Sequence, residues 1–131
     1  MLQAKKIAFI TLALIASVAF AADKMTVKEL LADAKKFDGK PVTVSGLVDT
    51  FKQKTSKKGN DYFTFKLVDK GDKKKVVNLY GQGKPKVEVK DGQLLSVTGT
   101  YRLEKSVGNS TFKNEIQVKP DTVRVLAQPK K

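Results

Sequence analysis

The alternation of apolar and polar residues in segment 61–69 constrains the fold of this chain more than any other feature of the sequence. Successive side chains of a β-strand point to opposite faces, so a pattern of period two predicts a strand with one buried face. The two faces of this strand would carry Phe63, Phe65 and Leu67 on one side, and Tyr62, Thr64, Lys66 and Val68 on the other. We therefore place Phe63 and Phe65 in the core.

The same alternation recurs along most of the chain after residue 40. It predicts four further strands, at 41–51, 74–81, 93–103 and 112–126, the last one broken near residues 119–120. Turn-forming residues at 70–73 and 91–92 separate some of these strands, and a flexible loop is expected at 104–110. Phe112 is also expected in the core.

Two glycines lie inside predicted strands. Gly46 interrupts the alternation of the first strand, which resumes one residue out of phase at Leu47 and Val48. Gly99 has a comparable place in the fourth strand. A glycine within a strand marks a bulge or a sharp bend, and bent strands allow a sheet to close on itself. The glycines therefore favour a barrel over a sandwich.

One short segment before the strands has helical periodicity. Thr26 and Glu29 form the pattern of a capping box, in which each side chain accepts a hydrogen bond from the other residue's backbone amide. Apolar residues at helical spacing extend this helix over 27–36, and Gly39 and Pro41 end it. The sequence thus predicts an all-β barrel preceded by a short N-terminal helix.

The first 21 residues have the pattern of a secretory signal peptide. Lys5 and Lys6 precede an apolar run at 7–20, and small residues at 19 and 21 fit cleavage before Ala22. The run is short for a membrane anchor, although an uncleaved anchor is the alternative. We expect an exported protein, periplasmic or secreted, without stable membrane insertion after cleavage. The expected organisation is a leader at 1–21, a helix and lead-in at 22–40, the barrel at 41–127 and a basic tail at 128–131.

The chain is strongly basic. Lysine and arginine number 26 against 13 acidic residues, a net charge of +13, and loss of the two leader lysines leaves +11. Such a surface attracts polyanions such as nucleic acid, anionic lipid or acidic polysaccharide, although a high lysine content can also serve solubility alone. Only Arg102 and Arg124 are arginines. Lysine-rich surfaces favour contact with phosphates over the reading of bases.

The composition excludes most site chemistry. The chain has neither cysteine nor histidine, which rules out a thiol nucleophile, a Ser-His-Asp triad and a zinc site with the usual ligands. A metal-dependent nuclease would require clustered carboxylates, whereas the acidic residues of this chain are scattered along the sequence. We assign no catalytic residue, expect no cofactor and predict a binding protein rather than an enzyme.

Several segments together resemble an OB-fold of the tRNA-anticodon and helicase type, over about residues 40–126. They are 42–48 (VTVSGLV), 55–69 (TSKKGNDYFTFKLVD), 97–99 (VTG) and Tyr101. Similar domains occur in bacterial DNA polymerase III alpha subunits and in the exonuclease VII large subunit, and the resemblance implies a five-stranded Greek-key barrel. Exported stand-alone OB domains include a haem chaperone that attaches haem through histidine, a role that this chain cannot share.

In OB-folds the ligand generally lies on strands two and three, between the loop that joins strands one and two and the loop that joins strands four and five. The resemblance therefore implies a binding face made of Lys54, Lys57, Lys58, Asn60, Tyr62, Thr64, Lys66, Asn78, Tyr80, Arg102 and Lys105. Bases would stack on the two tyrosines while lysines contact phosphates. The plainer interpretation is that the tyrosines only cover the barrel and the lysines are only solvated.

Two functions are compatible with these residues. The first is an exported module that binds single-stranded nucleic acid, through a basic groove and with little sequence preference. The second is a periplasmic structural or stress-related OB protein that binds another anionic ligand, a peptide or a protein partner.

Overall fold

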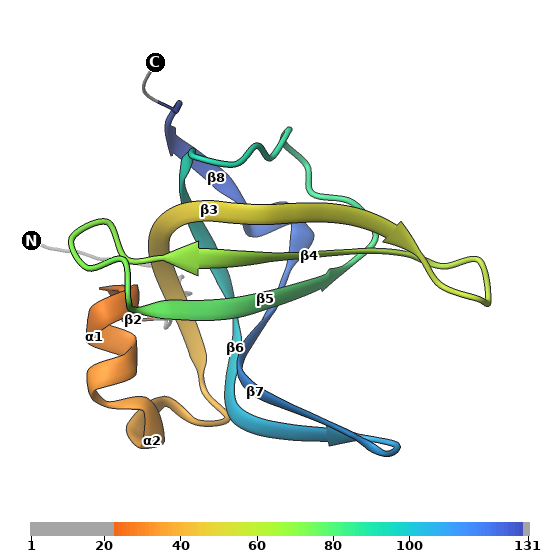
Figure 1. Ribbon diagram of the computed structural model, residues 1–131, viewed down its shortest axis with the longest axis horizontal. Helices are drawn as coiled ribbons and strands as arrows, with labels where there is room; N and C mark the ends of the chain where they lie inside the picture. Colours follow the sequence, from red (N-terminus) through yellow and green to blue (C-terminus); the bar gives the residue numbers. More distant parts are fainter. Residues whose placement is uncertain (1–22, 130–131) are drawn as a thin grey trace, which may run out of the picture.

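Strands and two short helices succeed one another along residues 23–129, the part of the chain that this computed structural model describes (Figure 1). The elements are Asp23–Thr26 (β2), Val27–Ala32 (α1), Ala34–Phe37 (α2), Pro41–Thr55 (β3), Asp61–Val68 (β4), Val76–Gln82 (β5), Leu94–Val107 (β6), Ser110–Val118 (β7), the 3-10 turn Pro120–Thr122 (η2) and Arg124–Ala127 (β8). The expected leader at 1–21 and the last two residues of the tail lie outside the described residues, as do the side chains of Lys105 and Phe112.

Five of the strands close into a barrel in the order β3-β4-β5-β7-β6, with β6 pairing back onto β3. The β5–β7 pair is parallel and the other neighbours in the barrel are antiparallel. The strand β3 makes closure possible, because its first half pairs with β6 and its second half pairs with β4. The predicted fold class, an all-β barrel of five strands behind a short helix, is confirmed.

Alternation places the apolar side chains inside this barrel. Phe63 and Phe65 are buried as expected, and the Phe51 ring packs against both, at centroid distances of 6.2 and 5.8 Å. Leu67, Leu79, Leu95 and Ile116 are also buried, each at 2% exposure or less. Burial of each such side chain contributes about 1.5–3 kcal/mol, so this interior is the main source of stability.

The bend in β3 lies four residues later than the sequence indicated. The burial alternation continues in phase through Gly46 to Val48, so the expected shift at Gly46 is wrong. The register with β4 shifts instead between Asp49 and Lys52, where Thr50 has a φ of 55°. Gly46 is required for a different reason: a Cβ there would lie 2.9 Å from the carbonyl oxygen of Val68.

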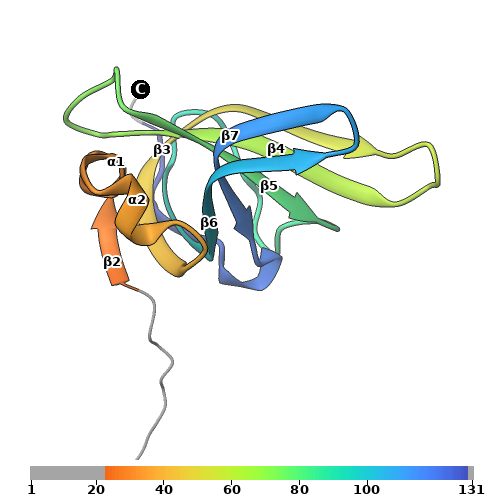
Figure 2. The same cartoon turned by 90° about the horizontal axis from the view of Figure 1, so that it is seen from below.

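Two strands extend well beyond their predicted ends. The strand β3 continues to Thr55, and β6 continues to Val107, so most of the expected 104–110 loop is paired with β7. The two resulting hairpins, β3–β4 and β6–β7, project to the same side of the barrel (Figures 1 and 2). The added residues of β3 pair with β4 and those of β6 pair with β7. Residues 52–55 of β3 are all exposed, so this extension carries no apolar alternation that the sequence could reveal.

The N-terminal segment is more elaborate than one helix. The capping box of Thr26 and Glu29 is present, but the helix ends at Ala32 and a second turn begins after Asp33, which has a φ of −129°. The preceding strand β2, which pairs in parallel with β3, was not predicted. Neither helix in residues 23–129 has the length and apolarity needed to cross a membrane.

A buried carboxylate joins this segment to the barrel. Asp69 is 5% exposed, and its two oxygens accept hydrogen bonds from the backbone amides of Lys28 and Gly71, at 2.9 and 3.0 Å. The first bond satisfies a free amide in the first turn of α1, and the second fixes the turn between β4 and β5. Asp69 therefore couples the helix to the end of the barrel.

The closest approach in the barrel wall is at Gly99 of β6. A Cβ at this position would overlap the carbonyl oxygen of Gln117 in β7, a backbone atom that cannot turn aside. We expect Gly99→Ala to lower the free energy of unfolding by about 1–3 kcal/mol, as overpacked substitutions do, measured by urea denaturation. Gly71→Ala is the matched control, because a Cβ there meets only Asp69 Oδ2 at 3.5 Å. Equal effects of the two changes would contradict this role for Gly99.

A second buried group lies two residues after Gly99 on β6. Tyr101 is fully buried, and its hydroxyl donates to Asn114 Oδ1 at 2.7 Å, while Asn114 Nδ2 donates to the carbonyl of Val76 at 2.7 Å. Burial raises the pKa of the Tyr101 hydroxyl above its usual value, and the charge of Asp38 adds to this effect. The native state therefore keeps a proton that the unfolded chain releases above about pH 10.

This raised pKa predicts a pH-dependent role for the hydroxyl. Its contribution to stability is complete below about pH 10 and is lost as the pH rises through the raised pKa. We expect Tyr101→Phe to cost about 1–3 kcal/mol at pH 8, because Asn114 Oδ1 loses its donor. The difference between the two proteins in urea denaturation should shrink toward pH 11. A difference that is independent of pH would refute the burial effect.

Candidate functional site

Two tyrosines form the centre of the outer face of β4 and β5. In the register of these strands Tyr80 lies opposite Thr64, and Tyr62 lies opposite Gln82, so the two rings are diagonal neighbours on one face. Their centroids are 5.7 Å apart and their planes are inclined by 36°. Both side chains are half-buried. The tyrosine pair thus forms one continuous aromatic surface that solvent reaches.

Polar side chains surround the tyrosine pair on the same face. Lys66 lies opposite Asn78 on β5 and opposite Asp49 on β3. Asn78 has a structural task as well, because its Nδ2 donates to the carbonyl of Lys113 at 3.2 Å and ties β5 to β7. The structure therefore brings together five of the predicted site residues here: Tyr62, Thr64, Lys66, Asn78 and Tyr80.

The projecting end of β3 adds lysines beside the tyrosine pair. Lys52 lies opposite Thr64, and Lys54 lies opposite Tyr62, so both lysines are in register with the aromatic face. Gln53 holds this end of the sheet in place, because its Nε2 donates to the carbonyls of Tyr62 and Gly83 at 2.9 and 3.0 Å. Lys52 therefore lies on the same face as the predicted site residue Lys54.

The tip of the β3–β4 hairpin is an ordered turn rather than a loose loop. The backbone amide of Ser56 donates to the Asn60 carbonyl at 2.8 Å, and the amide of Asn60 donates to Ser56 Oγ at 3.1 Å. Gly59 closes the turn with a φ of 87°. Lys57 and Lys58 are exposed on this turn. Asn60 holds the turn through its backbone, which positions the lysine pair.

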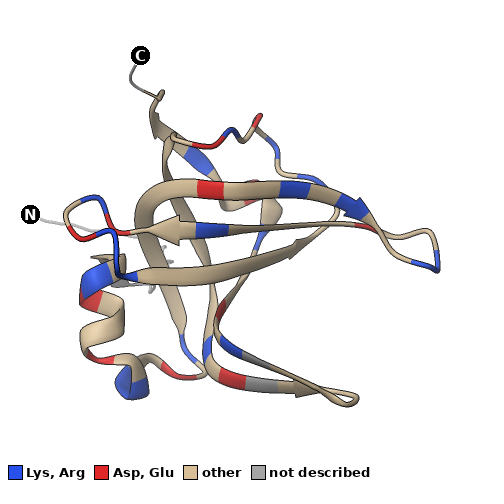
Figure 3. Ribbon diagram, viewed as in Figure 1, with Lys and Arg blue, Asp and Glu red and all other residues tan. Residues whose placement is uncertain are grey.

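The lysines of this end carry uncompensated charge. Within residues 23–129, neither Lys52, Lys54 nor the tip pair Lys57 and Lys58 has an acidic partner within 4.0 Å; the ion pair recorded there joins Lys90 to Glu88 at 3.7 Å. Figure 3 shows basic residues along the end of β3 and at the hairpin tip, and another basic group at the opposite end, in the turn between β4 and β5. The first group lies beside the tyrosines and the second does not.

The β6–β7 hairpin bounds the face on the other side. Arg102 lies opposite Glu115 of β7, and Thr100 lies opposite Gln117. Together these four side chains line a cleft of about 250 Å³. Lys105 lies opposite Phe112 in the backbone register, and its side chain is outside the described residues. Glu115 and Gln117 were missed in the sequence, because their place on the face depends on the parallel pairing of β5 with β7.

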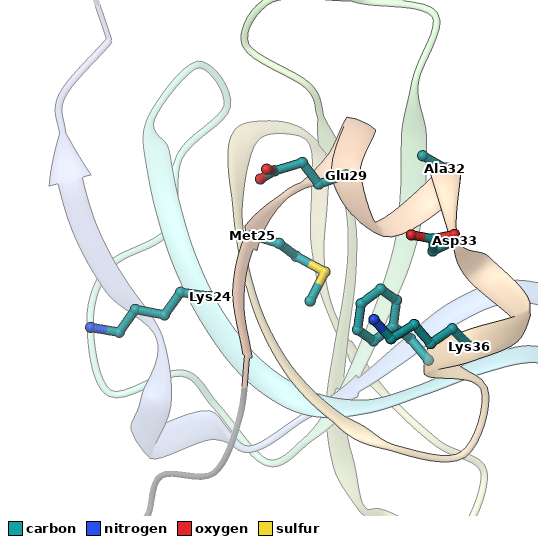
Figure 4. A pocket seen from close by; sticks show the side chains of 7 residues that line it. Lys24, Met25, Glu29, Ala32, Asp33 and Lys36 are labelled. Atoms are coloured by element: carbon teal, nitrogen blue, oxygen red, sulfur yellow. The ribbon is translucent and has the colours of Figure 1, made fainter.

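A second and larger hollow lies between β2 and the two helices. Its volume is about 420 Å³, and its lining contains Met25 and Phe37 together with charged side chains from β2 and the two helices (Figure 4). The ammonium of Lys36 lies 5.5 Å from the centre of the Phe37 ring. The charges around this hollow balance, because its lining has two lysines, Lys24 and Lys36, and two carboxylates, Glu29 and Asp33. It shares no residue with the tyrosine face and offers no excess charge to a polyanion.

No family model matches the sequence, and no curated protein matches it either. Solved structures match it in shape. A putative aspartyl-tRNA synthetase from Leishmania major Friedlin superimposes on 87% of this chain with a TM-score of 0.56 and 15% sequence identity, and the match spans 22% of the synthetase chain. A structure of yeast Stn1 and Ten1 matches 86% of this chain and 67% of that chain, with a TM-score of 0.52 and 15% identity. At this identity the likeness is one of fold, and together with the closed five-stranded barrel it shows that the chain has an OB-fold.

Proposed function

We propose that this protein binds single-stranded nucleic acid on the outer face of β4 and β5, with little sequence preference, and that it acts as a binding module without catalysis. The observation that carries the proposal is the tyrosine pair, 5.7 Å between ring centroids, flanked in register by the exposed lysines Lys52 and Lys54. The names of the structural neighbours include a tRNA synthetase, which supports nucleic acid as the class of ligand.

The chemistry of this face suits an unpaired strand. Base stacking on an aromatic side chain contributes about 1–3 kcal/mol per base, and it requires bases that are free of a duplex. Lysine ammonium groups contact phosphates as point charges and impose no orientation on them. Because neither interaction distinguishes one base from another, affinity would come mainly from the backbone and from stacking.

Export is part of the proposal. It rests on the leader pattern of residues 1–21, where two lysines precede the apolar run at 7–20. The strand β2 begins at Asp23, directly after the expected cleavage position. We place the mature protein in the periplasm or outside the cell.

A second candidate is a periplasmic structural or stress-related protein that binds another polyanion, a peptide or a protein partner. The lysines of the turn between β4 and β5, Lys73 to Lys75, favour this alternative, since they are exposed at the end away from the hairpin tips (Figure 3). A ligand held by total charge would use both basic groups equally. A single strand stacked on the tyrosine pair would use mainly the group on the β3–β4 hairpin.

The double change Tyr62→Ala and Tyr80→Ala tests stacking. We expect it to weaken binding of a labelled oligonucleotide by about tenfold or more in fluorescence anisotropy, from the loss of one or two stacked bases. The tyrosines are half-buried, so circular dichroism must show an intact fold. Unchanged affinity in the folded variant would point to bulk charge and to the second candidate.

The double change Lys57→Gln and Lys58→Gln tests the phosphate contacts. Each lost contact to a single strand reduces the slope of log affinity against log salt by about 0.7, so we expect a decrease of about 1.4. Lys74→Gln with Lys75→Gln is the matched control, because it removes the same charge from the other basic group and should leave the slope nearly unchanged. Equal decreases for both variants would argue against a defined path for the strand.

A further inference from the structure

The turn between β4 and β5 concentrates positive charge at the end of the barrel away from the hairpin tips (Figures 1 and 3). Four of the six residues at 70–75 are lysines, and all of them are exposed: Lys70, Lys73, Lys74 and Lys75. Lys28 of α1 is also exposed, and it lies beside the turn because its backbone amide donates to Asp69 Oδ1 at 2.9 Å. We call Lys28 and these four residues the turn lysines.

Hydrogen bonds to the backbone hold this turn in one shape. The amide of Asp69 donates to the carbonyl of Lys75 at 2.9 Å, and the amide of Lys75 donates to the carbonyl of Asp72 at 3.0 Å. The Asp72 carboxylate accepts the amide of Lys74 at 3.1 Å, and the buried Asp69 carboxylate accepts the amide of Gly71. Both carboxylates thus serve the backbone, and among the described residues neither forms an ion pair with a turn lysine within 4.0 Å. The turn lysines therefore carry unpaired charge on a fixed frame.

The chemistry of this end suits a charged surface better than a nucleic-acid strand. Neither the segment 69–75 nor α1 contains an aromatic residue, so a base has nothing to stack on here. The turn projects outward from the barrel, and lysine contacts anions as point charges without imposing an orientation (Figures 1 and 2). An anionic bilayer fits such a group, because its headgroups lie in one plane and several of them are contacted at once.

We propose that the turn lysines dock this protein on the surface of an anionic lipid bilayer, by charge and without insertion. The inference goes beyond the proposed function, because it gives each end of the barrel its own ligand. In this orientation the hairpin tips point away from the membrane, and a strand on the tyrosine pair stays accessible (Figure 3). The proposed export, which rests on the leader pattern of residues 1–21, would bring the protein to a membrane surface.

Co-sedimentation with vesicles of phosphatidylcholine and roughly one third phosphatidylglycerol tests the docking, on protein purified after export and leader removal. Each lysine near such a surface raises partitioning about fivefold, so neutralising the four lysines of the turn should weaken binding at least about a hundredfold. This variant is K70Q, K73Q, K74Q and K75Q. The matched control removes the same charge from the hairpin, and it should weaken binding by less than about tenfold; it is K52Q, K54Q, K57Q and K58Q. Equal losses, or no binding of the wild-type protein, would overturn the proposal.

Energy transfer to the lipid reads the orientation and keeps most of the charge in place. Because the chain has no cysteine, one introduced cysteine can carry a fluorescent donor at a single position. Lys73→Cys labels the turn and Lys57→Cys labels the hairpin tip, and both changes remove one exposed lysine. With acceptor-labelled headgroups in the same vesicles, transfer from position 73 should exceed transfer from position 57.

Equal transfer from the two positions, or more from position 57, would contradict docking through the turn even if the quadruple variant did not fold. Neither vesicle measurement uses nucleic acid. A failure of the proposed strand binding would therefore leave both results unchanged, and a failure of docking would leave oligonucleotide binding by the tyrosine face intact.

Discussion

The double pairing of β3 is the constraint on which the rest of the structure depends. One strand must hydrogen-bond to β6 along Pro41–Leu47 and to β4 from Leu47 onward, because without both pairings the sheet has open edges. The chain achieves this with a bend at Thr50, whose φ of 55° is costly for a β-branched residue. The Asp91 carboxylate accepts the amide of Phe51 at 3.0 Å and holds the bend in place.

Barrel closure also determines what the outer face can contain. Once every second side chain is committed to the interior, the alternate ones of β4, β5, β7 and β6 are arranged in adjacent rows around the wall. The tyrosine pair, the Lys66–Asn78 pair and the Glu115–Arg102 pair are consecutive parts of this surface. Because the backbone fixes the rows, side chains far apart in sequence, such as those of Tyr80 and Gln117, become neighbours through strand pairing.

The sequence predicts those features of the structure whose interactions join residues close together in the chain. Local signals were sufficient where one element determines its own form: the alternation around Phe63 and the capping box of Thr26 both have their physical cause within a few residues. Long-range pairings were missed. The strand β2 exists only because β3 lies beside it, and Asp23–Thr26 contains no pattern of its own. Glu115 was missed for the same reason, since only the parallel pairing with β5 places it on the face.

Location rather than total charge gives the lysines of the β3–β4 hairpin their significance. At physiological ionic strength, exposed charges more than about 8 Å apart are largely screened from one another, so the net charge of the domain cannot act as one site. A local group of lysines adds to the affinity for a flexible polyanion only if a second interaction holds the ligand beside that group. Lys52 and Lys54 meet this condition, because strand register places them next to the rings of the tyrosine pair. The lysines of the β4–β5 turn lack such a neighbouring platform, and the two basic groups are therefore not equivalent.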